Sequence, residues 1–125
     1  MDTSVVVPNL DAYQIGRLTK IHQLNMEVTD GNHWVARAFG SDLLAHLTAS
    51  MQQLLHKTVV PGLRSKSTDK MIYYAGHDIN IYFLRVMLGL NWLTDSWNVN
   101  QSPPGGLLRF ELLRGVSSQA TCACL

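Results

Sequence analysis

The sequence predicts an α/β domain in which helices pack on a mostly parallel sheet. The first observation is a short apolar run, Met71–Ala75, whose aromatic and β-branched residues are typical of a strand buried on both faces. The second is a change of period after Gly76, because from Asp78 onward apolar residues recur at helical spacing. The third is the order of the predicted elements, which runs helix, helix, strand, helix, strand.

Two amphipathic helices are predicted before this strand. The first covers Leu10–Val28 and begins near Asn9 or Asp11, since apolar residues recur there at intervals of three or four. The sequence T-D-G-N at 29–32 then marks a turn. The second helix runs from about residue 33 to 57 and carries an apolar stripe of leucines and a methionine.

The chain after the central strand is predicted to contain one more helix and one more strand. The helix begins at Asp78 and is followed by a loop over Leu90–Gln101. A Pro-Gly turn then leads into a strand over Leu107–Leu113, where apolar and polar residues alternate. We expect residues 115–125 to form a disordered tail.

Several conspicuous side chains are best interpreted as structural. Trp92 and Trp97 could line a pocket, but covering of the core is the favoured interpretation. Arg109 and Glu111 are expected to be a solvated or cross-strand pair rather than catalytic groups. Three histidines lack metal-ligand spacing and are expected on helix surfaces or edges: His22, His46 and His56.

Composition excludes several classes of function. The 125 residues carry 10 basic and 9 acidic side chains, so no polyanion-binding surface is indicated and we expect no nucleic-acid partner. No run of 18 apolar residues is present, so no membrane span is expected, and Met1–Leu10 does not have the pattern of a secretory signal. Neither a cofactor motif nor a metal-binding pattern is found. The last four residues, C-A-C-L, formally fit a prenylation box with Cys122 as acceptor, which leaves a lipid-anchored interaction module as one alternative.

The turn between the central strand and its helix is the strongest candidate site. His77 and Asp78 lie there, at the carboxyl end of a predicted strand and the start of a helix, where α/β folds bind ligands and where anions are favoured. Two adjacent titratable groups at such a place suggest proton transfer to or from an anionic substrate. The structural alternative is that Asp78 serves only as the helix N-cap and His77 is an ordinary turn residue.

The residues of this turn resemble a known motif. A-G-H-D-I-N at 75–80 resembles the His-Asp motif of the histidine acid phosphatases, in the branch that contains the bacterial phytases and glucose-1-phosphatases. Downstream, L-N-W at 90–92 and P-P-G-G-L-L-R-F-E at 103–111 resemble the phytase-like pattern at fitting distances. Upstream, I-H at 21–22 and V-A-R at 35–37 fall in the register expected for the preceding helices.

This resemblance covers about residues 13 to 114 and implies both a fold and a reaction. Residues 1–114 would be the C-terminal part of a three-layer, phosphoglycerate-mutase-like histidine phosphatase domain. The family hydrolyses phosphomonoesters through a phosphohistidine intermediate, in secreted, periplasmic or lysosomal proteins. The resemblance implies that Asp78 is the general acid, which protonates the leaving oxygen, and that His77 stabilises the phosphoryl group. It implies no cofactor.

The chain departs from the family pattern in one decisive respect. It contains no R-H-G-x-R-x-P motif, so the nucleophilic histidine and the arginines that clamp the phosphate are absent. A general acid without a nucleophile should give little turnover, and we expect the chain alone to be inactive and to need a missing N-terminal segment. The alternative is a catalytically inactive remnant or pseudoenzyme with a weak phosphate site. Ile79 also stands where many relatives carry a small hydroxyl residue, which bears on substrate choice.

Overall fold

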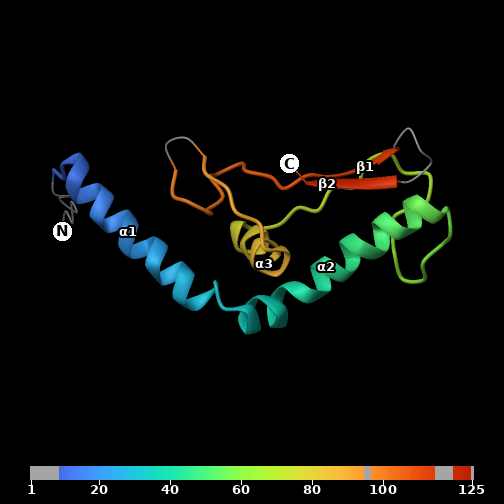
Figure 1. Cartoon of the computed structure of the whole chain (residues 1–125), viewed down its shortest axis with the longest axis horizontal. Coiled ribbons are helices and arrows are strands. Elements are labelled where there is room, and N and C mark those ends of the chain that lie inside the picture. The colour runs from blue at the N-terminus through green and yellow to red at the C-terminus, as the bar shows by residue number, and fades with distance from the viewer. Residues whose placement is uncertain (1–8, 95–96, 115–119, 125) are drawn as a thin grey trace, which may run out of the picture.

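The computed structural model describes residues 9–94, 97–114 and 120–124. Within these ranges lie three helices and two strands, namely α1 (Ala12–Thr29), α2 (His33–His56), α3 (Asp78–Leu88), β1 (Phe110–Arg114) and β2 (Ala120–Cys124). Figure 1 shows α1 and α2 following one another in an open V, with α3 beside the first half of α2 and the strand pair above its second half. The described fold is therefore dominated by helices.

The predicted α/β architecture with a mostly parallel sheet is wrong. β1 and β2 pair antiparallel, with Phe110 opposite Cys124, and they form the two-stranded sheet of the described ranges. Met71–Ala75, the predicted buried strand, belongs to no strand, and the side chains of Met71 and Tyr73 are 81% and 79% exposed. A strand needs a neighbour that takes its backbone hydrogen bonds, and no described segment pairs with residues 71–75.

The C-terminal strands also differ from the expectation. The predicted strand over Leu107–Leu113 begins only at Phe110 and extends to Arg114. Its partner, β2, falls within residues 115–125, where a disordered tail was expected; residues 115–119 and 125 lie outside the described ranges. Antiparallel pairing gives these strands a hairpin ladder that the alternation of one strand alone does not reveal.

The two predicted N-terminal helices are confirmed as α1 and α2. They could be predicted because their ends depend on contacts between neighbouring residues. At the start of α1, Asp11 Oδ1 accepts a hydrogen bond from Gln14 N at 2.7 Å, and Gln14 Oε1 accepts one from Asp11 N at 3.0 Å. At the start of α2, Asn32 Oδ1 accepts a hydrogen bond from Trp34 N at 2.8 Å. α2 ends before Lys57, whose φ of 57° is left-handed.

The core lies where α3 crosses the first half of α2. Its buried side chains are Ala36, Tyr82, Phe83 and Val86, with Met26, Val35, Ile79 and Met87 packed around them. Gly40 of α2 permits the close approach, since a Cβ there would lie 2.8 Å from Phe83 Cβ and 2.6 Å from Met87 Cε. The rings of Phe39 and Phe83 stack beside it with their centroids 6.1 Å apart.

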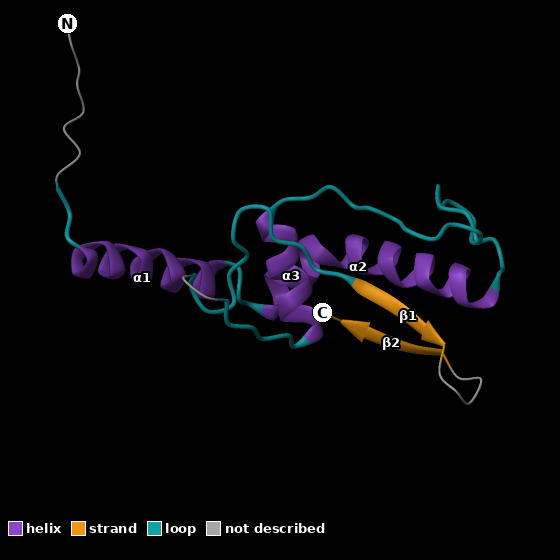
Figure 2. Cartoon of the chain, turned by 90° about the horizontal axis from the view of Figure 1, so that it is seen from above, coloured by secondary structure: helices purple, strands orange, loops and turns teal. Residues whose placement is uncertain are grey.

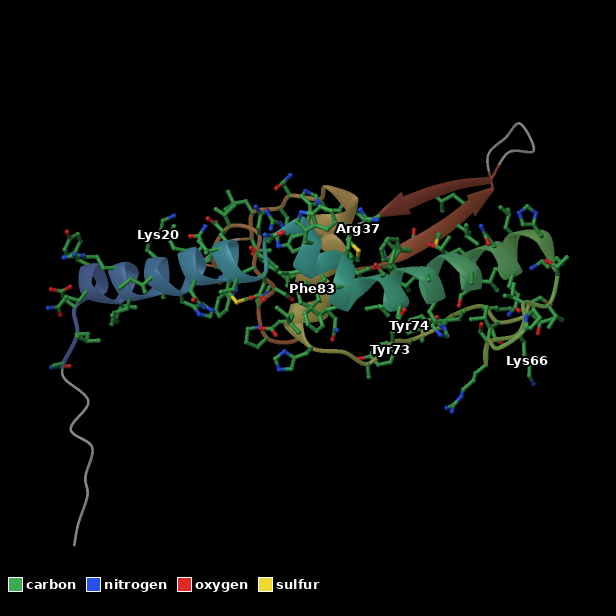
Figure 3. All side chains as sticks on the ribbon, turned by 90° about the horizontal axis from the view of Figure 1, so that it is seen from below. Lys20, Arg37, Lys66, Tyr73, Tyr74 and Phe83 are labelled. Atoms are coloured by element: carbon green, nitrogen blue, oxygen red, sulfur yellow. The ribbon has the colours of Figure 1, made fainter. Side chains whose placement is uncertain are left out.

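The connection from α2 to α3 is fastened along α2 by polar contacts. The buried amide of Gln53 donates from Nε2 to Ser65 O at 2.6 Å and accepts at Oε1 from Val60 N at 2.8 Å. Farther along, Ser50 Oγ and Tyr74 OH are 2.9 Å apart, and Figure 3 shows Tyr74 on the segment that runs beside α2. These contacts direct residues 71–77 toward the start of α3.

A large part of the molecule is exposed. The accessible surface is 9980 Å², whereas a compact monomer of 14.0 kDa should expose only about 6700 Å². Figure 2 shows one cause, because α1 projects from the body formed by α2, α3 and the strand pair. None of the helices in the described ranges combines the length and the hydropathy that a bilayer span requires.

The close crossing at Gly40 predicts that alanine destabilises the protein at this position but not at an exposed helical glycine. Gly40→Ala should lower the free energy of unfolding by about 1–3 kcal/mol, because the new methyl group must displace Met87 or Phe83. Gly16→Ala is the matched control, since a Cβ at Gly16 in exposed α1 meets no atom within 4 Å and should stabilise its helix slightly. Urea unfolding measures both variants, and equal effects would contradict the role of Gly40.

The buried amide of Gln53 predicts that its loss destabilises the protein more than the loss of an exposed glutamine of α2. Gln53→Leu should cost about 1–3 kcal/mol, because Val60 N–H and Ser65 C=O both lose their partner. Its neighbour Gln52 is exposed, and Gln52→Leu should change the stability by less than about 0.5 kcal/mol. Thermal or urea unfolding compares the two variants. A Gln53→Leu protein as stable as the Gln52→Leu protein would show that this network contributes nothing.

Candidate active site at the start of α3

The helix α3 begins one residue earlier than a cap at Asp78 would require. His77 has the extended backbone of an N-cap residue and Asp78 is the first helical residue. The turn is held by Asn80, whose Oδ1 accepts a hydrogen bond from His77 N at 2.8 Å. Gly76 lies against this amide, since a Cβ at Gly76 would be 3.1 Å from Asn80 Oδ1. The interpretation of Asp78 as N-cap is therefore corrected, and its carboxylate lies in the first turn, where negative charge is favoured.

The two predicted site residues contact each other. His77 Nδ1 lies in contact with Asp78 Oδ1, and their side chains are 82% and 56% exposed. The same carboxylate oxygen accepts a hydrogen bond from Ile79 N at 2.8 Å. An imidazole and a carboxyl group are thus held together in solvent at a helix N-terminus, which is an arrangement suited to proton exchange with a bound anion.

Asp78 also faces a cleft of ligand size. The cleft has a volume of about 710 Å³ and lies between the second half of α1, the first two turns of α3 and residues 93–94 and 97–102. The α1 wall contains Thr19, His22 and Met26, and the α3 wall contains Asp78 and Tyr82. Among the described residues that line it, Asp78 is present and His77 is not.

The third wall of the cleft comes from residues 93–94 and 97–102, which are joined to Trp92 by hydrogen bonds. Trp92 N donates to Asn100 Oδ1 at 2.9 Å, and Asn100 N returns a hydrogen bond to Trp92 O at 3.0 Å. The indole of Trp92 donates to Gln101 O at 3.1 Å. Trp92 is thereby half-buried, whereas Trp97 is 43% exposed and lines the cleft, so the favoured assignment of Trp97 to the core is corrected.

Sequence reasoning missed most of this cleft. His22 was expected on a helix surface or edge, and it is exposed there but also lies in the cleft wall. No role was predicted for Gln101, although it is buried and lines the same cleft. Their spacing in the chain carries no signal, because residues 22, 78 and 101 meet only through the packing of α1 and the loop against α3.

Arg109 Nε and Glu111 Oε1 lie 3.1 Å apart, and both side chains are accessible to solvent. Neither residue lines the cleft.

The charge around the cleft is low. No lysine or arginine occurs among its described lining residues. Across residues 9–94, 97–114 and 120–124 no group of three or more histidine, cysteine, aspartate or glutamate side chains could hold a metal ion. A phosphate placed near Asp78 would therefore need cationic groups from another segment of polypeptide.

Among the described residues, the pKa of the Tyr82 phenol is the one that the fold clearly shifts. Burial raises the pKa of Tyr82 above its ordinary value, because the phenolate loses hydration, and the nearby Arg85 guanidinium opposes part of this increase. The guanidinium carbon of Arg85 lies 5.0 Å from the centre of the Tyr82 ring. Tyr82 should therefore stay neutral where it borders the cleft.

Comparison with known proteins gives no match to a family model, to a curated protein or to a solved structure. The candidate site is therefore interpreted from its own residues and from the motif resemblance.

The raised pKa of Tyr82 predicts an alkaline loss of stability. The folded state holds this proton more tightly than the unfolded state, so the contribution is complete below about pH 10 and is lost as the pH rises further. Urea unfolding between about pH 8 and pH 11 should show a decline that is smaller in Tyr82→Phe. Tyr73→Phe, at an exposed position, is the matched control. A decline identical in both variants would contradict this assignment.

Proposed function

We propose that this chain supplies the acid half of a phosphomonoester hydrolase site of the histidine acid phosphatase type. Asp78 is the general acid and His77 stabilises the phosphoryl group, while the nucleophile and the arginine clamp come from a segment that carries R-H-G-x-R-x-P. The observation that carries the proposal is the contact of His77 Nδ1 with Asp78 Oδ1 at the start of α3, beside a cleft that Asp78 lines.

The geometry supports different tasks for the two residues. His77 is the more exposed and lies outside the cleft, so its imidazole can approach phosphate oxygens from the solvent side. Asp78 borders the cleft and can reach an oxygen of a molecule bound there. In the proposed reaction a histidine nitrogen of the second segment bonds to phosphorus, the P–O bond to the alcohol breaks, and the alcohol oxygen takes the proton of Asp78 as it leaves.

The surface supports the requirement for a second segment. Met71–Ala75 is an extended apolar run that leads to His77 without a strand beside it, and Tyr73 is largely exposed there (Figure 3). Unpaired strand-like segments of this kind are covered in stable proteins. A segment that brought the nucleophile would also cover part of this surface.

A catalytically inactive remnant is the second candidate. The observation that favours it is the sequence itself, in which no histidine follows an arginine. In that case the chain would keep the turn of His77 and Asp78 as a weak anion site. The two candidates differ in whether an R-H-G-x-R-x-P segment is encoded in the same reading frame or binds to this chain.

The proposal predicts a leaving-group effect. The isolated chain should hydrolyse an aryl phosphate at acid pH only at trace rates, whereas the product of the complete reading frame should turn it over. In that active form Asp78→Asn should lower kcat by about 10²–10⁴-fold for an alkyl phosphate. The loss should be clearly smaller for 4-nitrophenyl phosphate, whose leaving group hardly needs a proton.

Two controls make this experiment decisive. His77→Gln should weaken binding of inorganic phosphate, while His33→Gln should not, although His33 is also exposed at the start of a helix. Equal losses for both esters in Asp78→Asn would reject the acid role. A complete reading frame without the motif and without turnover would leave only the inactive remnant.

A further inference from the structure

The helix α1 carries an exposed row of mostly apolar side chains. Its members recur at intervals of three or four residues, which places them on one side of the helix: Tyr13, Arg17, Ile21, Leu24 and Val28. We call these five residues the outer stripe. Its four apolar members are 73%, 64%, 48% and 77% exposed, and among the described elements α1 packs extensively against none. An apolar row of this kind is usually buried against another helix.

The outer stripe lies opposite the side by which α1 joins the rest of the molecule. Thr19, His22 and Met26 line the cleft, and Met26 also packs against the core. Successive residues of a helix turn by about 100°, so these three residues lie on the opposite side of α1 from the outer stripe. Figure 2 shows that α1 projects from the body formed by α2, α3 and the strand pair. A partner bound along the outer stripe would therefore leave the cleft open.

The exposed area is large enough for association with a second copy of this chain. The accessible surface of 9980 Å² exceeds that of a compact monomer of 14.0 kDa by about 3300 Å². A standard interface removes only about 800 Å² from each partner. The projecting helix α1 contributes to the excess, and a second copy on the outer stripe would reduce it.

The charges beside the outer stripe complement those of a second copy in the antiparallel direction. Lys20 and Glu27 are exposed, flank the stripe on one side and lie seven residues apart, and Figure 3 shows Lys20 projecting from α1. In an antiparallel pair that aligns Ile21 with Leu24 of the second copy, the apolar rows interlock. Lys20 then lies beside Glu27 of the second copy, and Glu27 lies beside its Lys20. A parallel pair gives neither match, because Lys20 then meets Asn25.

The same two charges disfavour other antiparallel alignments. A shift by one heptad in one direction places Lys20 beside Lys20 of the second copy, and a shift in the other direction places Glu27 beside Glu27. Like charges at such positions repel and so select one alignment. Exposed ion pairs add little affinity by themselves, so the apolar contact of Ile21 with Leu24 must provide most of it.

We infer that α1 joins two copies of this chain as an antiparallel helix pair, in which Ile21 of each copy packs on Leu24 of the other and Lys20 lies beside Glu27. The two bodies then lie at opposite ends of the pair, because each α1 leads into α2 at its C-terminal end. The inference does not rest on the proposed function, since it uses neither His77 nor Asp78.

Sedimentation equilibrium of the whole chain tests this association. The mass should rise with concentration and approach twice the 14.0 kDa of one chain at about 100 µM. Ile21→Glu should weaken the association at least about tenfold, because it buries a carboxylate against Leu24 of the second copy. Ile15→Glu is the matched control, since Ile15 is an exposed isoleucine of α1 outside the outer stripe. A monomer at about 100 µM, or an equal response of the two variants, would overturn the inference.

Exchange of the two charges tests the antiparallel direction. Lys20→Glu and Glu27→Lys should each weaken the association about tenfold at low salt, because like charges then face each other twice. Mixed in equal amounts, the two variants should associate nearly as tightly as the wild type, since opposite charges face each other again in both pairs. No rescue on mixing would overturn the inference. Both residues are exposed, so this experiment decides the matter if Ile21→Glu does not fold.

A different occupant of the outer stripe gives a different result. If the segment that carries R-H-G-x-R-x-P covered the stripe instead, the complete form would be monomeric and Ile21→Glu would impair its assembly, which would overturn the inference. Failure of the phosphatase proposal is separate, because association of the whole chain requires neither phosphate nor turnover. Turnover of aryl phosphates by a monomer would leave the phosphatase proposal in place and reject the helix pair.

Discussion

The contact of α2 with α3 at Gly40 is the constraint on which the rest of the structure depends. Among the described helices these two pack on each other, and the buried apolar cluster of Ala36, Tyr82, Phe83 and Val86 lies at their contact. It also orients the start of α3, because Phe83 and Met87, which meet Gly40, lie on the helix that begins at Asp78. Loss of this contact would therefore disturb the core, the position of His77 and one wall of the cleft together.

The lack of a pairing partner for residues 71–75 explains why the predicted parallel sheet was wrong. Residues 71–75 have the composition of a buried strand, but composition specifies only the environment a segment prefers and cannot supply a neighbouring strand. The 125 residues form one described ladder, between β1 and β2, and it is antiparallel and distant in the chain from this segment. Tyr74 reaches α2 through Ser50 instead of a sheet. The segment therefore forms no strand, because it lacks the partners that would make it β-structure.

The predicted helices and the cleft show what sequence can reveal. Asp11 with Gln14, and Asn32, determine helix starts through contacts within three residues, so local reading found them. The turn at His77 was found for the same reason, with the cap displaced by one residue. The cleft joins His22, Asp78 and Gln101, whose proximity depends on tertiary packing and leaves no periodic trace in the sequence.

The position of Asp78 both supports the phosphatase proposal and limits it. One carboxyl group contacts His77 on the solvent side and borders the cleft on the other. A phosphate ester has a charged group joined through one oxygen to an organic part. The lining of the cleft matches the organic part, whereas the chain provides only His77 and the amides of a helix N-terminus for the charged part. The phosphatase proposal therefore requires that cationic groups come from another segment.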